Sequence, residues 1–202
     1  MDIELREGWK LESIQENDDS VTAIFDGGRT VTGSFLIGCD GIKAASRCAI
    51  LGMQGIGPGM PTFTGLAQVA GISPTPESLD AFRRGSLCNW YGDGKHVIAY
   101  PISTSLTSWA VTVPQTRAHK ETWRLSGPAE IETQREMLAS ELAGFEPIVL
   151  DLIKTASRII KFGLFDREEL SPEQWHSKRC VLVGDAAHPT TPHLGQGANQ
   201  AL

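Results

Sequence analysis

The segment that most constrains the fold is "CVLVGDAAHPTTPHLGQGANQAL", which runs from Cys180 to Leu202. The apolar run "RCVLVGD" predicts a buried strand that ends in a Gly-Asp turn at Gly184 and Asp185. Two glycines, Gly195 and Gly197, then lead into "ANQAL", which is typical of the start of a helix. A strand followed by such a turn and loop is typical of the sheet edge at which α/β proteins bind ligands.

Composition and charge narrow the class of protein. The 202 residues are enough for one domain, or for one and a half domains of a larger architecture. With 41% hydrophobic and 21% charged residues, the chain is expected to be globular. Its net charge of -6 argues against non-specific binding to nucleic acid or to an anionic membrane. The opening "MDIELREGWK" lacks the features of a secretory signal, and no segment approaches membrane-spanning length.

The cysteines indicate the compartment. Four of them are scattered along the chain without any C-x-x-C pair: Cys39, Cys48, Cys88 and Cys180. This pattern favours free thiols in a reducing compartment over a disulfide framework. We therefore expect a cytoplasmic protein, and the sequence leaves its oligomeric state open.

The first part of the chain is predicted to be mainly β-structure. Residues 2–37 contain alternating runs such as "VTAIF", which are separated by the polar turns "ENDDS" and "DGG". The next run, "SFLIGCDG", predicts a second buried strand that ends in an Asp-Gly turn at Asp40 and Gly41. The segment from Gly52 to Pro61 is too rich in glycine and proline for a regular element, so we expect a linker.

The middle of the chain has a different pattern. The runs "FTGLAQVAGI", "SLCNWYGDGKHVIAYPIS" and "SWAVTV" predict strands, the second of them a hairpin around Gly92-Asp93-Gly94. Between Pro128 and Phe145 the apolar residues recur with helical spacing, and "EPIVLDLIKTAS" predicts a second amphipathic helix. The run "RIIKFGLF" predicts one more strand. We therefore expect an α/β nucleotide-binding domain formed by residues 1–59 and 166–202, interrupted by an antiparallel-sheet domain with helices at 60–165.

The closing segment also suggests which ligand it binds. Asp185 is expected at the carboxyl end of its strand, where a carboxylate can accept hydrogen bonds from two sugar hydroxyls. Alternatively, Asp185 could simply cap the next turn. The free N–H groups of a glycine-rich helix start favour a partner with partial negative charge. A flavin ring, which gains negative charge on reduction, would suit that position.

Two motifs resemble one known family. "VLVGDAAHPTTPHLGQGANQAL" closely resembles the Gly-Asp motif of the flavin-dependent aromatic hydroxylases, the class A flavoprotein monooxygenases, and "FLIGCDGIKAASR" resembles their Asp-Gly motif. The resemblance covers essentially the whole chain and is nearest to salicylate-hydroxylase-like members. It implies a partial Rossmann-like FAD-binding domain interrupted by an antiparallel-sheet substrate domain. The chain departs from the family pattern at Ala44, where the family usually has serine, and it keeps the family's arginine at Arg47.

The resemblance also implies which residues bind the cofactors. Asp185 would bind the ribityl-ribose side of FAD, and the loop with Pro192, Gly195 and Gly197 would wrap the isoalloxazine ring. Asp40 and Arg47 would help to organise both FAD and the nicotinamide cofactor, and Pro192 would line the reaction site. The cofactor-binding residues implied in this way are Gly184, Asp185, Pro192, Gly195, Gln196, Gly197, Asn199, Asp40, Gly41 and Arg47.

The implied reaction is the hydroxylation of an aromatic or phenolic small molecule. FAD would be reduced by NADH or NADPH, O₂ would be captured as a flavin C4a-hydroperoxide, and a hydroxyl group would pass to the ring. Because the flavin carries the difficult step, the protein has to orient the substrate and exclude water, and no separate catalytic side chain is implied. The sequence identifies neither the substrate nor the choice between NADH and NADPH.

Other interpretations of single features are weaker. His188 and His193 could ligate a metal, but no further cluster with ligand spacing accompanies them. The glycines in Gly55 to Gly59 miss the dinucleotide spacing and are interrupted by proline, and "GDGKH" lacks the other residues of a phosphate loop. Four aromatic residues could line a substrate pocket or belong to an ordinary core: Trp90, Tyr91, Tyr100 and Trp109.

One expected part of the family pattern is missing. The family begins with a strand, G-x-G-x-x-G and a helix, and nothing before Asp2 supplies them. The sequence is therefore expected to be an internal piece of a monooxygenase, and whether this chain alone is active stays open. The alternative is a catalytically inactive truncated paralogue with only a binding or scaffolding role.

Overall fold

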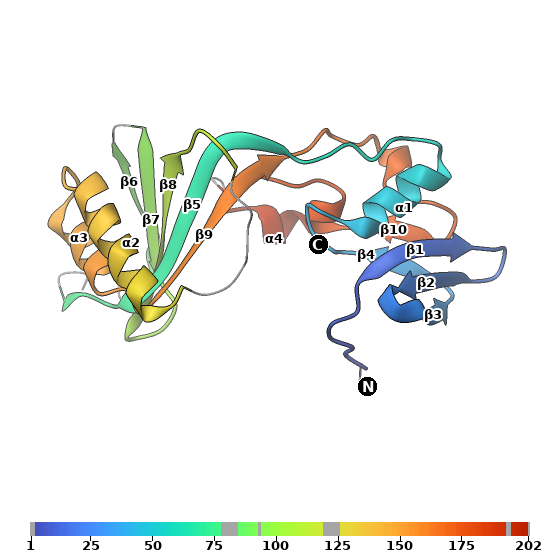
Figure 1. The fold of residues 1–202 in the computed structure, drawn as a ribbon, viewed down its shortest axis with the longest axis horizontal. Coiled ribbons are helices and arrows are strands. Elements are labelled where there is room, and N and C mark those ends of the chain that lie inside the picture. Colours follow the sequence, from blue (N-terminus) through green and yellow to red (C-terminus); the bar gives the residue numbers. More distant parts are fainter. Residues whose placement is uncertain (1–2, 78–84, 93, 119–125, 193–194, 202) are drawn as a thin grey trace. The chain divides into compact units, whose positions relative to one another are not determined.

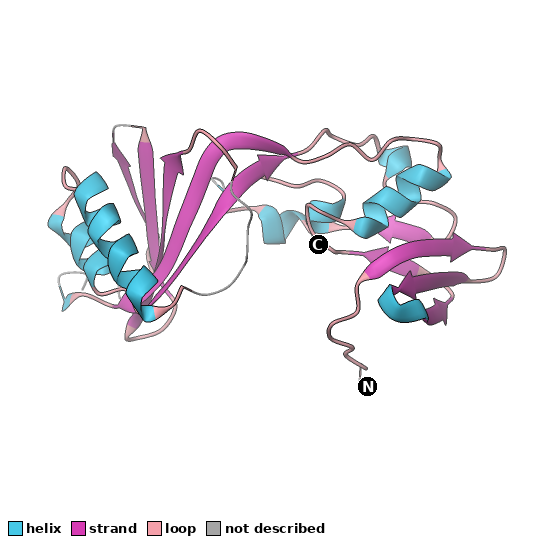
Figure 2. Ribbon diagram, viewed as in Figure 1, coloured by secondary structure: helices cyan, strands magenta, loops and turns pink. Residues whose placement is uncertain are grey.

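The structure is a computed structural model that describes residues 3–77, 85–92, 94–118, 126–192 and 195–201. The chain splits into two compact units. One is formed by Met1–Thr62 together with Phe165–Leu202, and the other by Phe63–Leu164. Figure 1 shows their helices and strands along the chain, and Figure 2 shows the same elements by type.

The first unit contains two small sheets. An antiparallel sheet has the order β1-β2-β3, with strands β1 (Leu11–Glu16), β2 (Val21–Phe25) and β3 (Arg29–Gly33). The second sheet pairs β4 (Leu36–Gly38) in parallel with β10 (Cys180–Leu182), two segments that lie far apart in the sequence. The Asp-Gly turn follows β4 and the Gly-Asp turn follows β10. Because these neighbouring strands run parallel, the two turns lie at the same edge of the sheet.

A helix covers one face of this parallel pair. Helix α1 (Ala45–Met53) buries Ile50 and Leu51 in a core that includes Cys180 and Leu182 of β10. The helix was not predicted, and its last two residues fall in the segment that was expected to be a linker. That part of the linker prediction was wrong, because the apolar residues of the helix pack on the strands and outweigh the low helix propensity of Gly52.

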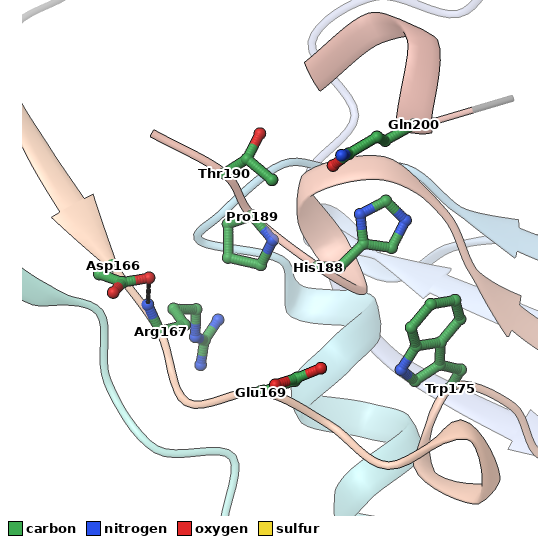
Figure 3. A pocket seen from close by; sticks show the side chains of 8 residues that line it. All are labelled: Asp166, Arg167, Glu169, Trp175, His188, Pro189, Thr190 and Gln200. Carbon is green, nitrogen blue, oxygen red and sulfur yellow. Dashed lines mark hydrogen bonds between the residues drawn. The ribbon is translucent and has the colours of Figure 1, made fainter. Parts of the chain in front are cut away.

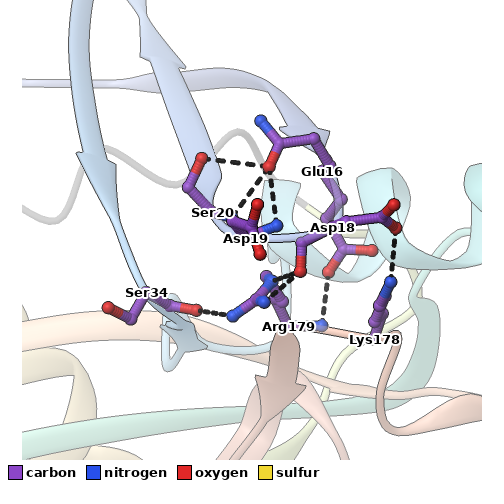
Figure 4. A network of polar contacts seen from close by, with 8 residues as sticks. Glu16, Asp18, Asp19, Ser20, Ser34, Lys178 and Arg179 are labelled. Atoms are coloured by element: carbon purple, nitrogen blue, oxygen red, sulfur yellow. Dashed lines mark hydrogen bonds and ion pairs between the residues drawn. The ribbon is translucent and has the colours of Figure 1, made fainter.

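A polar network fixes the start of β10 (Figure 4). The Glu16 carboxylate accepts hydrogen bonds from the Ser177 hydroxyl at 2.6 Å and from the Arg179 backbone N–H at 2.7 Å. The Arg179 guanidinium donates to the carbonyl oxygen of Asp18 at 3.0 Å and to that of Ser34 at 2.9 Å. Arg179, the residue directly before β10, therefore ties the start of this strand to the β1–β2 turn and to the residues before β4.

The second unit is a five-stranded sheet with the order β6-β7-β8-β5-β9. Its strands are β5 (Thr62–Pro74), β6 (Cys88–Gly92), β7 (Lys95–Pro101), β8 (Leu106–Pro114) and β9 (Arg158–Asp166). The predicted hairpin is confirmed, since β6 pairs antiparallel with β7 up to Gly92 and Lys95; Asp93 in its turn lies outside the described residues. In Figure 2, the helices α2 (Pro128–Glu141) and α3 (Pro147–Lys154) lie against one face of the sheet.

The core of this unit lies between the sheet and its helices. Leu138 and Leu142 of the α2 region and Val149 and Leu152 of α3 are fully buried there with Trp109 of β8. The Trp109 indole N–H donates to the Ser73 hydroxyl at 2.8 Å. Trp109 is therefore a core residue, as the alternative interpretation of the aromatics predicted.

Three further expectations can be compared with the structure. The expectation of β-structure from residue 2 onward was wrong for residues 3–10: among the described residues the first strand begins at Leu11, and the chain before it turns at Gly8, whose φ of 71° lies in the left-handed region. The four cysteines are free, as predicted. Within the described residues, no helix is both long enough and apolar enough to cross a membrane.

Candidate functional site

The candidate site lies at the edge where β4 and β10 end. The pairing of the two strands continues one residue further, because the Val183 N–H donates to the carbonyl oxygen of Gly38 at 2.9 Å. The chain then enters the Asp-Gly turn after β4 and the Gly-Asp turn after β10. Both predicted motifs therefore stand side by side, on strands joined by backbone hydrogen bonds.

The Asp-Gly turn leads directly into helix α1. Gly41 has a φ of 76°, and its carbonyl oxygen accepts a hydrogen bond of 3.0 Å from the Ala44 N–H. Asp40 is exposed, and its Oδ2 atom accepts a hydrogen bond of 3.0 Å from the backbone N–H of Ser46. The Ser46 hydroxyl donates to the other carboxylate oxygen, Oδ1. Ser46 was not among the predicted site residues.

Arg47 is buried and holds the Gly-Asp turn. Its side chain is 1% exposed, and its Nη1 atom donates to the carbonyl oxygen of Ala187 at 3.0 Å and to that of Ala186 at 3.4 Å. Nη2 donates to the carbonyl oxygen of Glu168 at 2.7 Å. Burial lowers the pKa of the Arg47 guanidinium, and the nearby positive charge of Arg167 lowers it further. The structure thus places this predicted site residue inside the protein, bonded to backbone.

Asp185 is exposed in the Gly-Asp turn. The turn closes because the N–H groups of Ala187 and His188 both donate to the carbonyl oxygen of Gly184 at 2.9 Å, and Gly184 has a φ of 58°. Within the described part of the chain, no group donates a hydrogen bond to the Asp185 carboxylate. This geometry argues against the alternative in which Asp185 caps its own turn.

The residues after the glycine-rich loop return to the Gly-Asp turn, since a Cβ atom added at Gly184 would lie 3.3 Å from the Cβ atom of Ala201. The Gly195 N–H donates to the carbonyl oxygen of Pro192 at 3.0 Å, and Gly195 has a φ of 60°. Gln196 is the N-cap of the single-turn helix α4 (Gly197–Gln200), and its side-chain oxygen accepts a hydrogen bond from Asn199 at 3.1 Å. A Cβ atom added at Gly195 would meet no described atom within 4 Å, so the space beside this backbone is open.

A pocket of about 670 Å³ lies beside this loop (Figure 3). It is lined by Asp166, Arg167, Glu169, Trp175, His188, Pro189, Thr190 and Gln200. None of these was a predicted cofactor-binding residue, and His188 was considered only as a metal ligand. The Arg167 guanidinium is held by the carbonyl oxygens of Ile42, Pro58 and Gly59 at 2.7–2.9 Å. The lining residues Asp166 to Trp175 come from a polar segment without a motif, so the sequence carried no signal for this pocket.

The metal alternative gains no support from the geometry. The His188 ring packs against Trp175, with centroids 5.1 Å apart, and His193 lies outside the described residues. Among the described residues there is no group of three His, Cys, Asp or Glu side chains that could hold a metal ion.

Comparisons with known proteins agree with the resemblance. The family model described as "FAD binding domain" matches residues 2–202. The chain is 27% identical over 195 residues to 6-hydroxynicotinate 3-monooxygenase of Bordetella bronchiseptica, covering 96% of this chain and 48% of that protein. It is 30% identical over 205 residues to salicylate hydroxylase of Pseudomonas putida, covering 96% of this chain and 46% of that protein.

A solved structure is similar in the same way. The crystal structure of Klebsiella pneumoniae HpxO complexed with FAD and uric acid matches with a TM-score of 0.78 and 28% identity, over 96% of this chain and 46% of that one. The predicted fold class, α/β with an antiparallel-sheet part, is confirmed by this match. The chain spans about half the length of the curated relatives it matches.

Proposed function

Because this chain belongs to the family of flavin-dependent aromatic hydroxylases, the class A flavoprotein monooxygenases, we propose that it contributes the Asp-Gly and Gly-Asp turns to the FAD site of such an enzyme. We assign residues 1–59 and 166–202, which fall within the first compact unit, to FAD, and residues 60–165, which include the second unit, to the substrate. The single observation that carries it is the exposed Asp185 carboxylate, which is free of donors among the described residues and stands at the end of β10.

The residues present fit the cofactor. An exposed carboxylate can accept hydrogen bonds from two hydroxyls of the ribityl-ribose chain, and such bonds to a charged acceptor are the stronger ones. The loop from Pro192 to Gly197 would face the isoalloxazine ring with backbone groups, because the space beside Gly195 is open and a close approach meets no side chain. FAD, when bound, would supply the redox chemistry that uses NADH or NADPH and O₂ to hydroxylate a ring.

The other predicted site residues would act on the shape of the site. Arg47 would act through the carbonyl oxygens of Ala186 and Ala187, which it holds next to Asp185. Asp40 and Gly41 would set the turn beside it, Gly184 would shape the Gly-Asp turn, and Gln196 and Asn199 would stabilise the start of α4. Together these residues would orient the cofactor without taking part in proton transfer.

We propose a small, electron-rich aromatic or heteroaromatic substrate. The relatives named above act on hydroxynicotinate and salicylate, and the similar crystal structure contains uric acid. We also propose a cytoplasmic location, which the four free cysteines support.

The proposal is tested by supplying the protein, at the full length of the relatives it matches, with FAD, NADH or NADPH, isotope-labelled O₂ and a panel of hydroxylated aromatic acids. The expected result is oxidation of the nicotinamide that depends on one of the acids, with one labelled oxygen atom in the product. Binding of FAD without any labelled product from the panel would instead favour the inactive paralogue with a binding role.

A further inference from the structure

The inference concerns how the Asp40 carboxylate is held. Asp40 is exposed, yet both of its oxygens are engaged by a single buried residue. Ser46 contributes its backbone N–H to Oδ2 at 3.0 Å and its hydroxyl to Oδ1. Ser46 itself is 1% exposed. We propose that Ser46 is the positioning residue of Asp40, and that it fixes the direction in which this carboxylate meets a cofactor.

The start of helix α1 explains why the pair forms. The N-cap residue, Ala44, is fully buried. Because alanine has no side-chain oxygen, it cannot accept a hydrogen bond from the first free N–H groups of the helix. Ser46 stands two residues further on, and its N–H needs an acceptor. Asp40 provides that acceptor from outside the helix, and the Ser46 hydroxyl returns a second hydrogen bond.

The packing around Ser46 fixes its hydroxyl. A Cβ atom added at Gly38 would lie 2.3 Å from the Ser46 Oγ atom, 2.6 Å from its Cβ atom and 3.0 Å from Leu182. The serine side chain therefore fills the place that a larger residue at Gly38 would occupy, directly on the paired strands β4 and β10. A rigid hydroxyl on this surface restrains a carboxylate that would otherwise rotate freely in solvent.

This arrangement leaves Asp40 able to contact a ligand. A carboxylate has about four lone-pair sites, and Ser46 uses two of them. The remaining two sites keep a fixed direction as long as the Ser46 hydroxyl is present. The inference rests on the proposed function in one respect, since a cofactor is needed to make use of that direction.

The pair itself is tested in the protein without any cofactor. Ser46→Ala, Asp40→Ala and the double variant are compared by urea unfolding, with Ser73→Ala in the second unit as a control for the loss of a buried hydroxyl. In the otherwise unchanged protein, Ser46→Ala is expected to lower the folded-to-unfolded ratio roughly fivefold, as one net hydrogen bond would. In the Asp40→Ala background the same substitution is expected to have no further effect. Equal losses in both backgrounds would overturn the inference.

The positioning role is tested by FAD titration of the same variants in the protein at the full length of the relatives it matches. Ser46→Ala is expected to raise the FAD dissociation constant roughly tenfold in the otherwise unchanged protein and to leave it unchanged in the Asp40→Ala background. Ser73→Ala is expected to lower stability without changing the affinity. An affinity unaffected by Ser46→Ala would overturn the positioning role. If the full-length unchanged protein took up no FAD, the proposed function would fail, while the unfolding experiment would still decide whether Ser46 holds Asp40.

Discussion

The guanidinium of Arg47 donates a hydrogen bond of 3.0 Å to the carbonyl oxygen of Ala187, which lies 140 residues further along the chain. The contact joins helix α1 to the turn after β10, so the Asp-Gly and Gly-Asp motifs are linked by side chain as well as by strand pairing. A second contact, 2.7 Å to the carbonyl oxygen of Glu168, ties in the segment before β10.

Replacing Arg47 by lysine is expected to destabilise the protein. A single ammonium cannot reproduce the planar fork of donors, and each buried carbonyl left without a partner costs about 1–3 kcal/mol. We expect Arg47→Lys to lower the free energy of unfolding by about 2–4 kcal/mol in urea denaturation. The matched control is Arg158→Lys on the exposed side of β9, which should stay within about 0.5 kcal/mol of the unchanged protein. A loss no larger than that of the control would show that the fork is not needed.

Gly38 and Gly52 should respond to alanine in opposite directions. A methyl group at Gly38 would lie within 2.3–3.0 Å of Ser46 and Leu182, and such overpacking costs about 1–3 kcal/mol. A methyl group at Gly52 would meet nothing within 4 Å in helix α1, where alanine is favoured over glycine by about 0.5–1 kcal/mol. Thermal unfolding should therefore show a lower melting temperature for Gly38→Ala and an equal or higher one for Gly52→Ala. The opposite order would contradict the packing of Ser46.

Glu16 should make stability depend on acid pH. Burial by itself would raise the pKa of this carboxyl, but hydrogen bonds from Ser177, Cys180 and the backbone of Arg179 and Lys178 lower it below the ordinary value of 4.5. A carboxyl with a lowered pKa in the folded state contributes stability above pH 4.5 and loses it as the pH falls through the lowered value. Unfolding measured from neutral to acid pH should thus lose stability more steeply in the unchanged protein than in Glu16→Gln. Parallel curves would rule out this contribution.

The sequence pattern was enough to predict most strands and both helices of the second unit. In that unit neighbouring strands pair in the order β6-β7-β8, and the turn at Gly92 and Gly94 lies between two alternating runs. Local spacing carries the information for such pairs. The parallel pairing of β4 with β10 is different, because strands of three residues about 140 positions apart give no local signal for each other.

The residues that the sequence did not reveal are held by tertiary contacts. Helix α1 buries Arg47, Ile50 and Leu51 at helical spacing, but its run is short and ends among glycines. Ser46 was overlooked because the motif pointed to position 44, whereas the packing against Gly38 decides which hydroxyl meets Asp40. The pocket beside the loop is lined by residues from a polar segment with no periodic pattern, such as Glu169 and Trp175.

Alanine substitutions at the two loop glycines can distinguish a contact with the cofactor from a conformational requirement of the backbone. Gly195 has a φ of 60°, so alanine there should cost about 1–2 kcal/mol of stability. Alanine at Gly197 would only touch the Thr190 hydroxyl at 3.5 Å, so it should leave the fold unchanged. If this loop faces the flavin, Gly197→Ala in the FAD-binding protein of full family length should nevertheless release more hydrogen peroxide per reduced nicotinamide oxidised. An unchanged ratio together with unchanged FAD binding would remove this loop from the flavin site.

The most direct test of the account is an FAD titration of Asp185→Ala, monitored by flavin fluorescence, in the protein at the full length of the relatives it matches. The exposed carboxylate is proposed to bind ribityl-ribose hydroxyls, and a charge-assisted hydrogen bond of this kind contributes about 1.5–3 kcal/mol. The account predicts that Asp185→Ala raises the dissociation constant about 10- to 150-fold, while Asp151→Ala, which removes an exposed carboxylate from helix α3, leaves it unchanged. The same affinity for FAD in Asp185→Ala and in the unchanged protein would contradict the central claim.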